Sequence, residues 1–279
     1  MQYGGLKQIL AGKLKPRELE HVTRSFDVIG SIAVVEVRPE VQKHEGLIAD
    51  AIMKLNPNVR TVCARAGKHE GEFRVRRVRV IAGKKTTKTV YVESGVRMEV
   101  DLNKCYFSPR LGHERSRIAR QVRAGERVAV FFAGIGPYAL VIARAQPKVV
   151  VYAMELNTRA FDYMRRNVLL NNMSDRVFPI SGDCQHAVEL LPEKVDRVVM
   201  PLPWRASEFL DAALAVARRG AMIHYYAFGP ITDPYRKALS GVRDACEKNN
   251  RAFAVLEKRV VRPYSPREHQ VVIDFKLIK

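Results

Sequence analysis

The feature that most constrains the fold of this chain is a regular alternation of apolar runs and helical segments, which begins at about residue 100. The apolar runs end in a glycine, an acid or a proline, where a buried strand would give way to a turn. The runs are RVAVFFAG, VVVYAME, VFPISGD and VDRVVMPLP, and helices are expected over 115–122, 137–145, 158–171 and 206–218. Such alternation predicts an α/β fold with a doubly wound, mostly parallel sheet.

The C-terminal part of the chain predicts an antiparallel addition to this sheet. A further apolar strand, AMIHYYAF, precedes a helix expected over 234–249. The segments AFAVLEKRVV and HQVVIDFKLI then read as a pair of neighbouring strands. A Rossmann-like sheet that ends in an antiparallel hairpin is typical of class I methyltransferases.

The first hundred residues have a different pattern. Residues 1–22 are predicted to form a short helix and a linker, and residues 23–99 a small α+β domain. Short strands are expected in SIAVVEVRP, VRTVCARAG and FRVRRVRVIAG, with one helix in HEGLIADAIMKL, and KTVYVESGVRMEVDL reads as a hairpin that turns at Ser94-Gly95. Residues 100–279 make up the predicted larger domain.

A nucleoside-binding pattern lies at the ends of the predicted parallel strands. Gly134 and Gly136 form a Gly-x-Gly turn between a strand and a helix, where the missing Cβ allows a ligand to approach the backbone. Glu155 ends the next strand, where a carboxylate can accept hydrogen bonds from both ribose hydroxyls. Asp183 follows the third strand and can meet an adenine amino group.

The motif has no third glycine, since positions 139–140 are Ala139 and Leu140. This favours S-adenosylmethionine over a dinucleotide as the cofactor. The alternative is an ordinary set of strand–helix turns with a capping acid.

The charge of the chain predicts a polyanionic partner. There are 48 Lys and Arg against 29 Asp and Glu, a formal net charge of +19. Basic side chains that neutralise phosphates release counterions, so nucleic acid is favoured over an anionic membrane, and a charged surface without a partner remains the alternative.

The segment from Arg60 to Lys88 carries ten basic residues and the acids Glu70 and Glu72. Alternation along its strand would place Arg77 and Arg79 on the face opposite Arg74 and Arg76. One face would follow phosphates, and a solvated edge strand is the other interpretation.

Other patterns limit the class of protein. The cysteines are scattered without a CxxC pair, and the histidines have no metal-ligand spacing, so no metal site is predicted. No apolar run reaches roughly 18 residues and the N-terminus does not resemble a signal peptide, so a cytoplasmic protein is expected.

Several segments together resemble the archaeal and eukaryotic tRNA (guanine-37 N1)-methyltransferase family. They are SFDVIGSIAVVEV, GKHEGEFRVRRVRVIAG, KCYFSPRLGHERSRIA, FAGIGPYAL, MELNTRAFDYMRRNVLLNN, RVVMPLPWRASEFLDAAL, GAMIHYYAFG and EKRVVRPYSPREHQVVIDF. The resemblance implies methyl transfer from S-adenosylmethionine to N1 of guanosine 37, in the anticodon loop of tRNA. Family members often carry a further N-terminal domain that contacts the tRNA elbow, so this chain is expected to be a short form, and a monomer.

The resemblance also implies the catalytic residues. The glutamate of the RLGxER motif, which falls on Glu114, would remove the N1 proton, and the arginine of GEFRVR, which falls on Arg74, would stabilise charge that develops on O6. Taken alone, Glu114 also fits a solvated acid near a helix start, and Arg74 one more arginine of a basic strand.

The remaining implied site residues fall into two sets. Expected cofactor contacts are Tyr106, Phe132, Ala133, Gly134, Gly136, Glu155, Leu156, Asp183, Cys184 and Pro201. Expected RNA contacts are Arg76, Arg77, Arg110, Arg115, Pro203 and Trp204. Arg110 and Arg115 would hold backbone phosphates or pair with acids.

The chain departs from the family pattern at two sites. An Asn-Leu-Pro motif is replaced by Pro201-Leu202-Pro203, and proline provides neither a side-chain amide nor an N–H for the guanine edge. An aspartate ahead of the glycine loop is replaced by Val130. Trp204 would stack on a base instead, or serve in packing.

These departures keep two alternatives open. One is a related wyosine-pathway enzyme that transfers a methyl or an aminocarboxypropyl group, and the other is a tRNA-binding paralogue without catalysis.

Overall fold

The computed structural model describes residues 5–67 and 77–278, and it separates into two compact units. The first unit contains residues 1–93 and 97–111, and the second contains 94–96 and 112–279. The predicted boundary at 99/100 differs from this division, because the chain segment up to Leu111 stays with the first unit. The helices of the predicted linker, within 1–22, also belong to the first unit.

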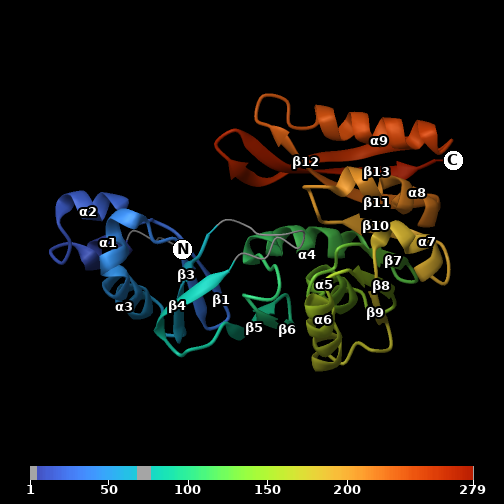
Figure 1. Ribbon diagram of the computed structural model, residues 1–279. Helices are drawn as coiled ribbons and strands as arrows, with labels where there is room; N and C mark the ends of the chain where they lie inside the picture. The colour runs from blue at the N-terminus through green and yellow to red at the C-terminus, as the bar shows by residue number, and fades with distance from the viewer. Residues whose placement is uncertain (1–4, 68–76, 279) are drawn as a thin grey trace. The chain divides into compact units, whose positions relative to one another are not determined.

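The first unit contains a small mixed sheet with the strand order β1-β2-β3-β4 (Figure 1). Strand β2 is antiparallel to β1 and parallel to β3, which is antiparallel to β4. Side chains from the helices α1, α2 and α3 join those of β1, β2 and β3 in one apolar core. The bounds are α1 Gly5–Leu10, α2 Pro16–His21, β1 Phe26–Ile29, β2 Ile32–Val35, η1 Pro39–His44, α3 Glu45–Leu55, β3 Thr61–Arg65 and β4 Val78–Gly83.

The predicted hairpin at Ser94-Gly95 is confirmed. Strands β5 (Lys88–Glu93) and β6 (Val96–Asp101) pair with each other, and the turn has φ of 49° at Ser94 and 76° at Gly95. Two successive positive φ angles define the tight turn that matches the twist of paired strands, and glycine takes such an angle without strain.

The second unit is built on the predicted parallel sheet, with the strand order β12-β13-β11-β10-β7-β8-β9 (Figure 1). Strands β11, β10, β7, β8 and β9 are parallel neighbours. Strands β12 and β13 are antiparallel to each other, and β13 is antiparallel to β11, as the C-terminal pattern predicts. The strands are β7 Arg127–Val130, β8 Val150–Glu155, β9 Val177–Ser181, β10 Val195–Met200, β11 Ala217–Pro230, β12 Phe253–Ser265 and β13 Glu268–Leu277.

The helices between these strands agree with the sequence pattern, and α5 covers the predicted range 137–145. A large apolar core joins strands β10, β11 and β13 to α7, α8 and α9. The bounds are η2 Pro109–Leu111, α4 Gly112–Gln121, α5 Pro137–Ala145, α6 Thr158–Leu170, η3 Cys184–His186, α7 Ala187–Leu190, η4 Ala206–Phe209, α8 Leu210–Val216 and α9 Arg236–Lys248.

The predicted helix over 206–218 is wrong at its end. Helix α8 stops at Val216, and Ala217 opens strand β11, which pairs with β10 from Val195 onward. Gly220 takes a φ of 83° within this strand, where a helix cannot continue. Pairing with β10 therefore outweighs the helix propensity of the alanine-rich segment.

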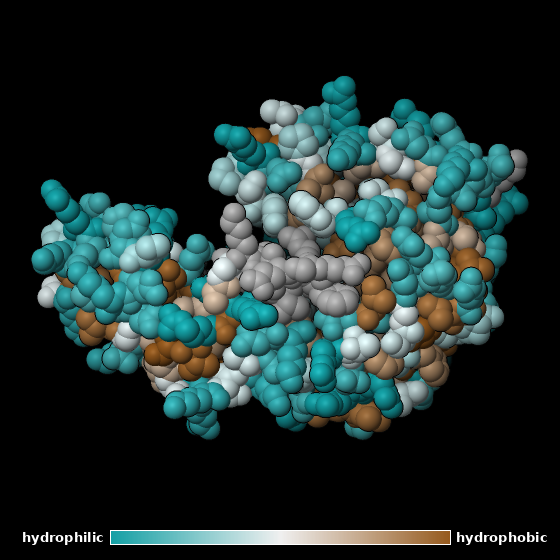
Figure 2. All heavy atoms as spheres, in the orientation of Figure 1, coloured by the Kyte–Doolittle hydropathy of each residue, from teal (hydrophilic) through white to brown (hydrophobic). Residues whose placement is uncertain are grey.

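The surface of the protein is largely hydrophilic on the face that Figure 2 shows. None of the helices formed by residues 5–67 and 77–278 has the length and apolar character needed to cross a bilayer.

Candidate functional site

The loop after β7 contains residues with left-handed backbone angles. Phe132, Gly134 and Gly136 all have positive φ, of 53°, 59° and 89°. A Cβ at Gly136 would lie 3.0 Å from Met164 Cγ, a tight contact, and the positive φ would strain any other residue there. A positive φ at a phenylalanine is uncommon and costs of order 1–3 kcal/mol, which is typical of functional loops.

Glu155, at the end of β8, lies directly against this loop. Its Oε2 accepts a hydrogen bond of 2.7 Å from the Gly134 N–H, and Oε1 accepts one of 2.8 Å from the Asn157 N–H. Burial raises the pKa of the Glu155 carboxyl, and the backbone N–H groups oppose that shift. Each oxygen keeps a lone pair, so the carboxylate can also accept the two hydroxyls of a ribose.

The next strand end brings two further predicted cofactor contacts to the same edge. Asp183 follows β9, and its Oδ1 accepts a hydrogen bond of 2.9 Å from the Gln185 N–H, which caps the short helix η3. Cys184 lies beside the backbone of Phe132, and burial raises the pKa of its thiol to about 12. The thiol is therefore neutral near pH 7.

Leu156 and Ala133 complete the predicted set around Glu155. Leu156 is 41 % exposed, and such an apolar side chain beside a nucleoside site can pack against a base. Ala133 is buried, and its N–H donates 2.8 Å to the Met154 carbonyl, which ties the loop to β8.

The segment after β10 contains the departure from the family motif. Pro201 and Pro203 are half-buried, and the Leu202 N–H donates 2.9 Å to the Met200 carbonyl across Pro201. Trp204 is 65 % exposed. Val130, at the end of β7, is fully buried.

Glu114 is buried in the second unit, at 5 % exposure, which differs from the picture of a solvated acid at a helix start. Its Oε1 accepts hydrogen bonds of 2.6 Å from the Tyr226 hydroxyl and 2.8 Å from Arg117 Nη2. Its Oε2 accepts 2.9 Å from Arg117 Nε. Among the described residues Oε2 has no further donor, so it retains the capacity to accept a proton.

The residues that hold Glu114 were missed by the sequence reasoning. Tyr226 lies on β11 and Arg117 one helical turn after Glu114 on α4. The i, i+3 spacing of Glu114 and Arg117 is a helix-pair signal that the sequence offers. The contact with Tyr226 joins residues 112 positions apart, which no local pattern indicates.

Of the predicted RNA contacts, Arg110 pairs with an acid and Arg115 is buried. Arg110 donates 2.7 Å from Nε to Asp27 Oδ1 and is half-exposed, which agrees with the alternative of pairing with an acid. Arg115 is 2 % exposed, whereas a phosphate contact requires a guanidinium that reaches solvent.

The other predicted site residues of the first part of the chain either belong to the first unit or fall outside the described residues. Tyr106 belongs to the first unit and is exposed. Arg77 precedes β4 and is exposed, and Arg79 forms a bidentate ion pair with Glu45. Arg74 and Arg76 lie outside the described residues.

A basic surface lies at one end of the small sheet in the first unit. We define it as Arg60, Lys84, Lys85 and Lys88, which are all exposed and form no ion pair with a described residue. The backbone holds them together, because the Lys84 N–H donates 2.9 Å to the Arg60 carbonyl.

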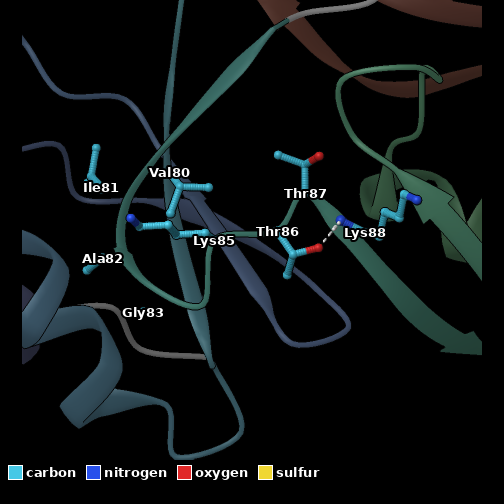
Figure 3. Close-up of a pocket in the computed structure, with 8 residues that line it drawn as sticks. All are labelled: Val80, Ile81, Ala82, Gly83, Lys85, Thr86, Thr87 and Lys88. Carbon is cyan, nitrogen blue, oxygen red and sulfur yellow. Dashed lines mark hydrogen bonds between the residues drawn. The ribbon is translucent and has the colours of Figure 1, made fainter.

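An open depression of about 750 Å³ lies within this surface, lined by Val80, Ile81, Ala82, Gly83, Lys85, Thr86, Thr87 and Lys88 (Figure 3). The Thr86 hydroxyl accepts 3.1 Å from the Lys88 N–H. Asp101, the acid bonded to Thr87, is buried, so the surface presents positive charge and hydroxyl groups.

Within residues 5–67 and 77–278, no three His, Cys, Asp or Glu side chains are placed to hold one ion.

Comparison with known proteins assigns both parts of the chain. Residues 89–255 match the TRM5/TYW2 methyltransferase domain, and residues 6–86 match the TYW2 N-terminal domain. The tRNA (guanine(37)-N(1))-methyltransferase Trm5b of Pyrococcus abyssi is 39 % identical over 94 % of this chain and 78 % of that protein.

Two further relatives are informative. The tRNA 4-demethylwyosine(37)-methyltransferase Taw21 of Saccharolobus solfataricus is 31 % identical over 93 % of this chain and 96 % of that protein. The solved complex of aTrm5 with tRNALeu is similar in structure, with a TM-score of 0.85 at 34 % identity, over 99 % of this chain and 79 % of that one.

Proposed function

Because this chain belongs to the TRM5/TYW2 methyltransferase family, we propose that it transfers the methyl group of S-adenosylmethionine to N1 of guanosine 37 in tRNA. The observation that carries the assignment is the 39 % identity with the Pyrococcus abyssi enzyme across 94 % of the chain. The sheet edge supports it, because the strand ends after β7, β8 and β9 bring a glycine turn, an acid and a second acid together.

The proposed cofactor site is the loop of Gly134 and Gly136 with Glu155. The backbone at both glycines has positive φ and no side chain, so a ligand can lie against it. Glu155 would hold the ribose hydroxyls, and Leu156 would pack against the adenine. When bound, S-adenosylmethionine supplies an electrophilic methyl group, with a neutral thioether as the leaving group.

The proposed base is Glu114. Its Oε2 would accept the N1 proton of guanine, so that the nitrogen electron pair can form the new bond to the methyl carbon while the carbon–sulfur bond breaks. Tyr226 and Arg117 fix the orientation of the carboxylate, as the hydrogen bonds to Oε1 and Oε2 require. Arg74 would stabilise the negative charge that develops on O6.

The test of the function is the identity of the product. Purified protein is incubated with methyl-labelled S-adenosylmethionine and unmodified tRNA transcripts that carry G or A at position 37. After digestion, mass spectrometry should detect N1-methylguanosine from the G transcript alone. Absence of methyl transfer to the G transcript contradicts the proposal.

A second candidate is methylation of 4-demethylwyosine at the same nucleotide. Two observations favour it: the match to Taw21 extends over 96 % of that relative, and Pro201 replaces the asparagine expected beside the guanine edge. A tRNA that carries 4-demethylwyosine belongs in the same assay. Methyl transfer to this tRNA, with none to the G transcript, identifies the second candidate.

We further propose that the basic surface of Arg60, Lys84, Lys85 and Lys88 binds phosphates of the tRNA. The double variant Lys85→Ala/Lys88→Ala should weaken tRNA binding about 3- to 10-fold and lower the slope of log Kd against log salt concentration by roughly 1 to 2, because two counterion-releasing charges are lost. Filter binding at several salt concentrations measures both quantities.

The matched control removes the same charge elsewhere. Lys148 and Lys194 are exposed and precede β8 and β10, at the amino ends of the parallel strands, opposite the edge of the cofactor loop. Lys148→Ala/Lys194→Ala should leave the salt slope unchanged. Equal slopes for both double variants would show that the basic surface does not bind tRNA.

A further inference from the structure

The Glu114 carboxylate is one end of a buried chain of charged side chains in the second unit. Arg117 bonds Glu114 through Nε and Nη2, and its Nη1 donates 2.6 Å to Asp274 Oδ2. Nη1 also donates 3.0 Å to Glu257, whose side chain is 44 % exposed. One guanidinium therefore links the proposed base to a buried acid and to an acid at the surface.

The chain continues from Asp274 through a histidine. Asp274 Oδ1 lies 2.7 Å from His224 Nδ1, and His224 Nε2 lies 2.7 Å from Arg197 Nη1. An arginine can only donate, so Nε2 accepts and Nδ1 carries the proton toward Asp274. Arg197 is held in turn by Glu126, with bonds of 2.7 Å and 3.0 Å.

Strand register places these groups in one row. His224 on β11 is the direct cross-strand partner of Asp274 on β13, which is the partner of Glu257 on β12. His224 interrupts the apolar run AMIHYYAF of β11 and Asp274 the run VVIDF of β13, and both residues are almost wholly buried. Helix α4 carries Glu114 and Arg117, so the row meets the helix at the Arg117 guanidinium.

The ionisation of these groups agrees with the geometry. Burial lowers the pKa of His224, so the imidazole is neutral near pH 7. Burial opposes the charge of Asp274, but contacts with His224 and Arg117 outweigh it and hold the pKa of Asp274 below its usual range. Asp274 is thus a fixed negative charge that faces Arg117.

We propose that Asp274 and His224 are positioning residues: they hold the Arg117 guanidinium, and through it the Glu114 carboxylate, in the orientation that deprotonates the target base. This inference rests on the proposed function of Glu114. Without the Asp274 charge, the nearest remaining acid for Arg117 Nη1 is Glu257, which would draw the guanidinium toward the surface and rotate Glu114 with it.

A core of this kind costs stability compared with apolar side chains, because several charges are desolvated. Apolar residues of similar size at 224 and 274 would fill the same space. The polar row therefore fits a requirement for orientation at Glu114 better than a requirement for stability.

The experiment compares Asp274→Asn, His224→Asn and His224→Gln with the wild-type protein. Asp274→Asn keeps the shape and removes the charge. His224→Asn can keep the donor toward Asp274, whereas His224→Gln places its amide nearer Arg197. Asp211→Asn is the matched control, since Asp211 pairs with Lys248 at the surface of α8. For each protein we would measure kcat and KM on the G37 transcript. Calorimetry gives the affinity for S-adenosylmethionine, and thermal unfolding gives Tm.

We expect kcat to fall about 10- to 100-fold in Asp274→Asn and His224→Gln, with KM and cofactor affinity within about twofold of wild type. His224→Asn should recover most of the rate, and Asp211→Asn should match wild type. In the wild-type protein without ligands, nitrogen NMR of labelled histidine should show the Nδ1–H tautomer for His224.

The outcomes separate this inference from the function on which it rests. A wild-type protein that methylates guanosine 37, with Asp274→Asn at full kcat per folded molecule, overturns the positioning role alone. A fall in Tm that accounts for all lost activity, or an Nε2–H tautomer at His224, does the same. A wild-type protein that transfers no methyl group overturns both.

Discussion

Replacing Glu114 by Gln should lower the single-turnover rate of methyl transfer by roughly 10²- to 10⁴-fold, the range in which general bases contribute. The amide has nearly the same shape as the carboxylate but cannot take the N1 proton. Rapid-quench assays with labelled cofactor and the G37 transcript measure the effect. Affinity for S-adenosylmethionine should stay within about twofold, because Glu114 does not belong to the cofactor loop.

Two further variants make this result specific. Glu247→Gln makes the same chemical change at an exposed site on α9 and should leave the rate unchanged. Glu114→Asp retains the charge but withdraws it by one methylene, and an intermediate rate is expected. Because Arg117 loses one of its buried acids in Glu114→Gln, Tm is measured as well. A rate within threefold of wild type in a folded Glu114→Gln protein would show that Glu114 is not the base.

Replacing Glu155 by Gln should weaken S-adenosylmethionine binding about 10- to 100-fold. Hydrogen bonds to a charged acceptor contribute about 1.5–3 kcal/mol each, and the amide retains one acceptor for the two ribose hydroxyls. Isothermal titration calorimetry with S-adenosylmethionine and with S-adenosylhomocysteine gives the two affinities. Both should fall by the same factor, since the ribose is common to them.

Glu193→Gln is the matched control for this loss. Glu193 is half-exposed and pairs with Arg127 at the amino ends of β10 and β7, opposite the cofactor loop. The affinity of the Glu193→Gln protein for both ligands should equal that of the wild-type protein. An unchanged affinity in Glu155→Gln would mean that the ribose lies elsewhere on the sheet edge.

The parallel sheet could be predicted from the sequence because its strands are buried on both faces and therefore continuously apolar. Helix α5 has its predicted range because Gly136 and Pro137 mark its start and its segment is strongly apolar. The short strand β1 (Phe26–Ile29) could not be predicted, since its four residues include Asp27 and show no clear apolar run. The end of α8 was misjudged because strand pairing of Ala217, a long-range contact, decides it.

That the strand ends after β7, β8 and β9 lie at one edge of the sheet was predictable for a similar reason. Gly134, Glu155 and Asp183 are each local signals at a strand end, and the parallel order brings such ends together. The 2.7 Å bond between Gly134 and Glu155 follows from that order.

The surroundings of Glu114 could not be predicted in the same way. Tyr226 meets Glu114 across 112 residues and Asp274 meets Arg117 across 157 residues, and no local pattern indicates such long-range pairing. A signal was nevertheless present, because His224 and Asp274 interrupt the otherwise apolar segments AMIHYYAF and VVIDF. A buried charge in such a strand calls for a partner across the sheet.

The place of β13 in the sheet has a consequence for how the protein is made. This strand follows all other described strands in the chain, yet it lies between β11 and β12 and carries Asp274. Every residue of the first unit leaves the ribosome before the second unit is complete, so the first unit can fold during synthesis. The second unit can close its sheet only after β13 has emerged. The orientation of Glu114 is thus among the last features to form, and a nascent chain that lacks β13 is expected to be inactive.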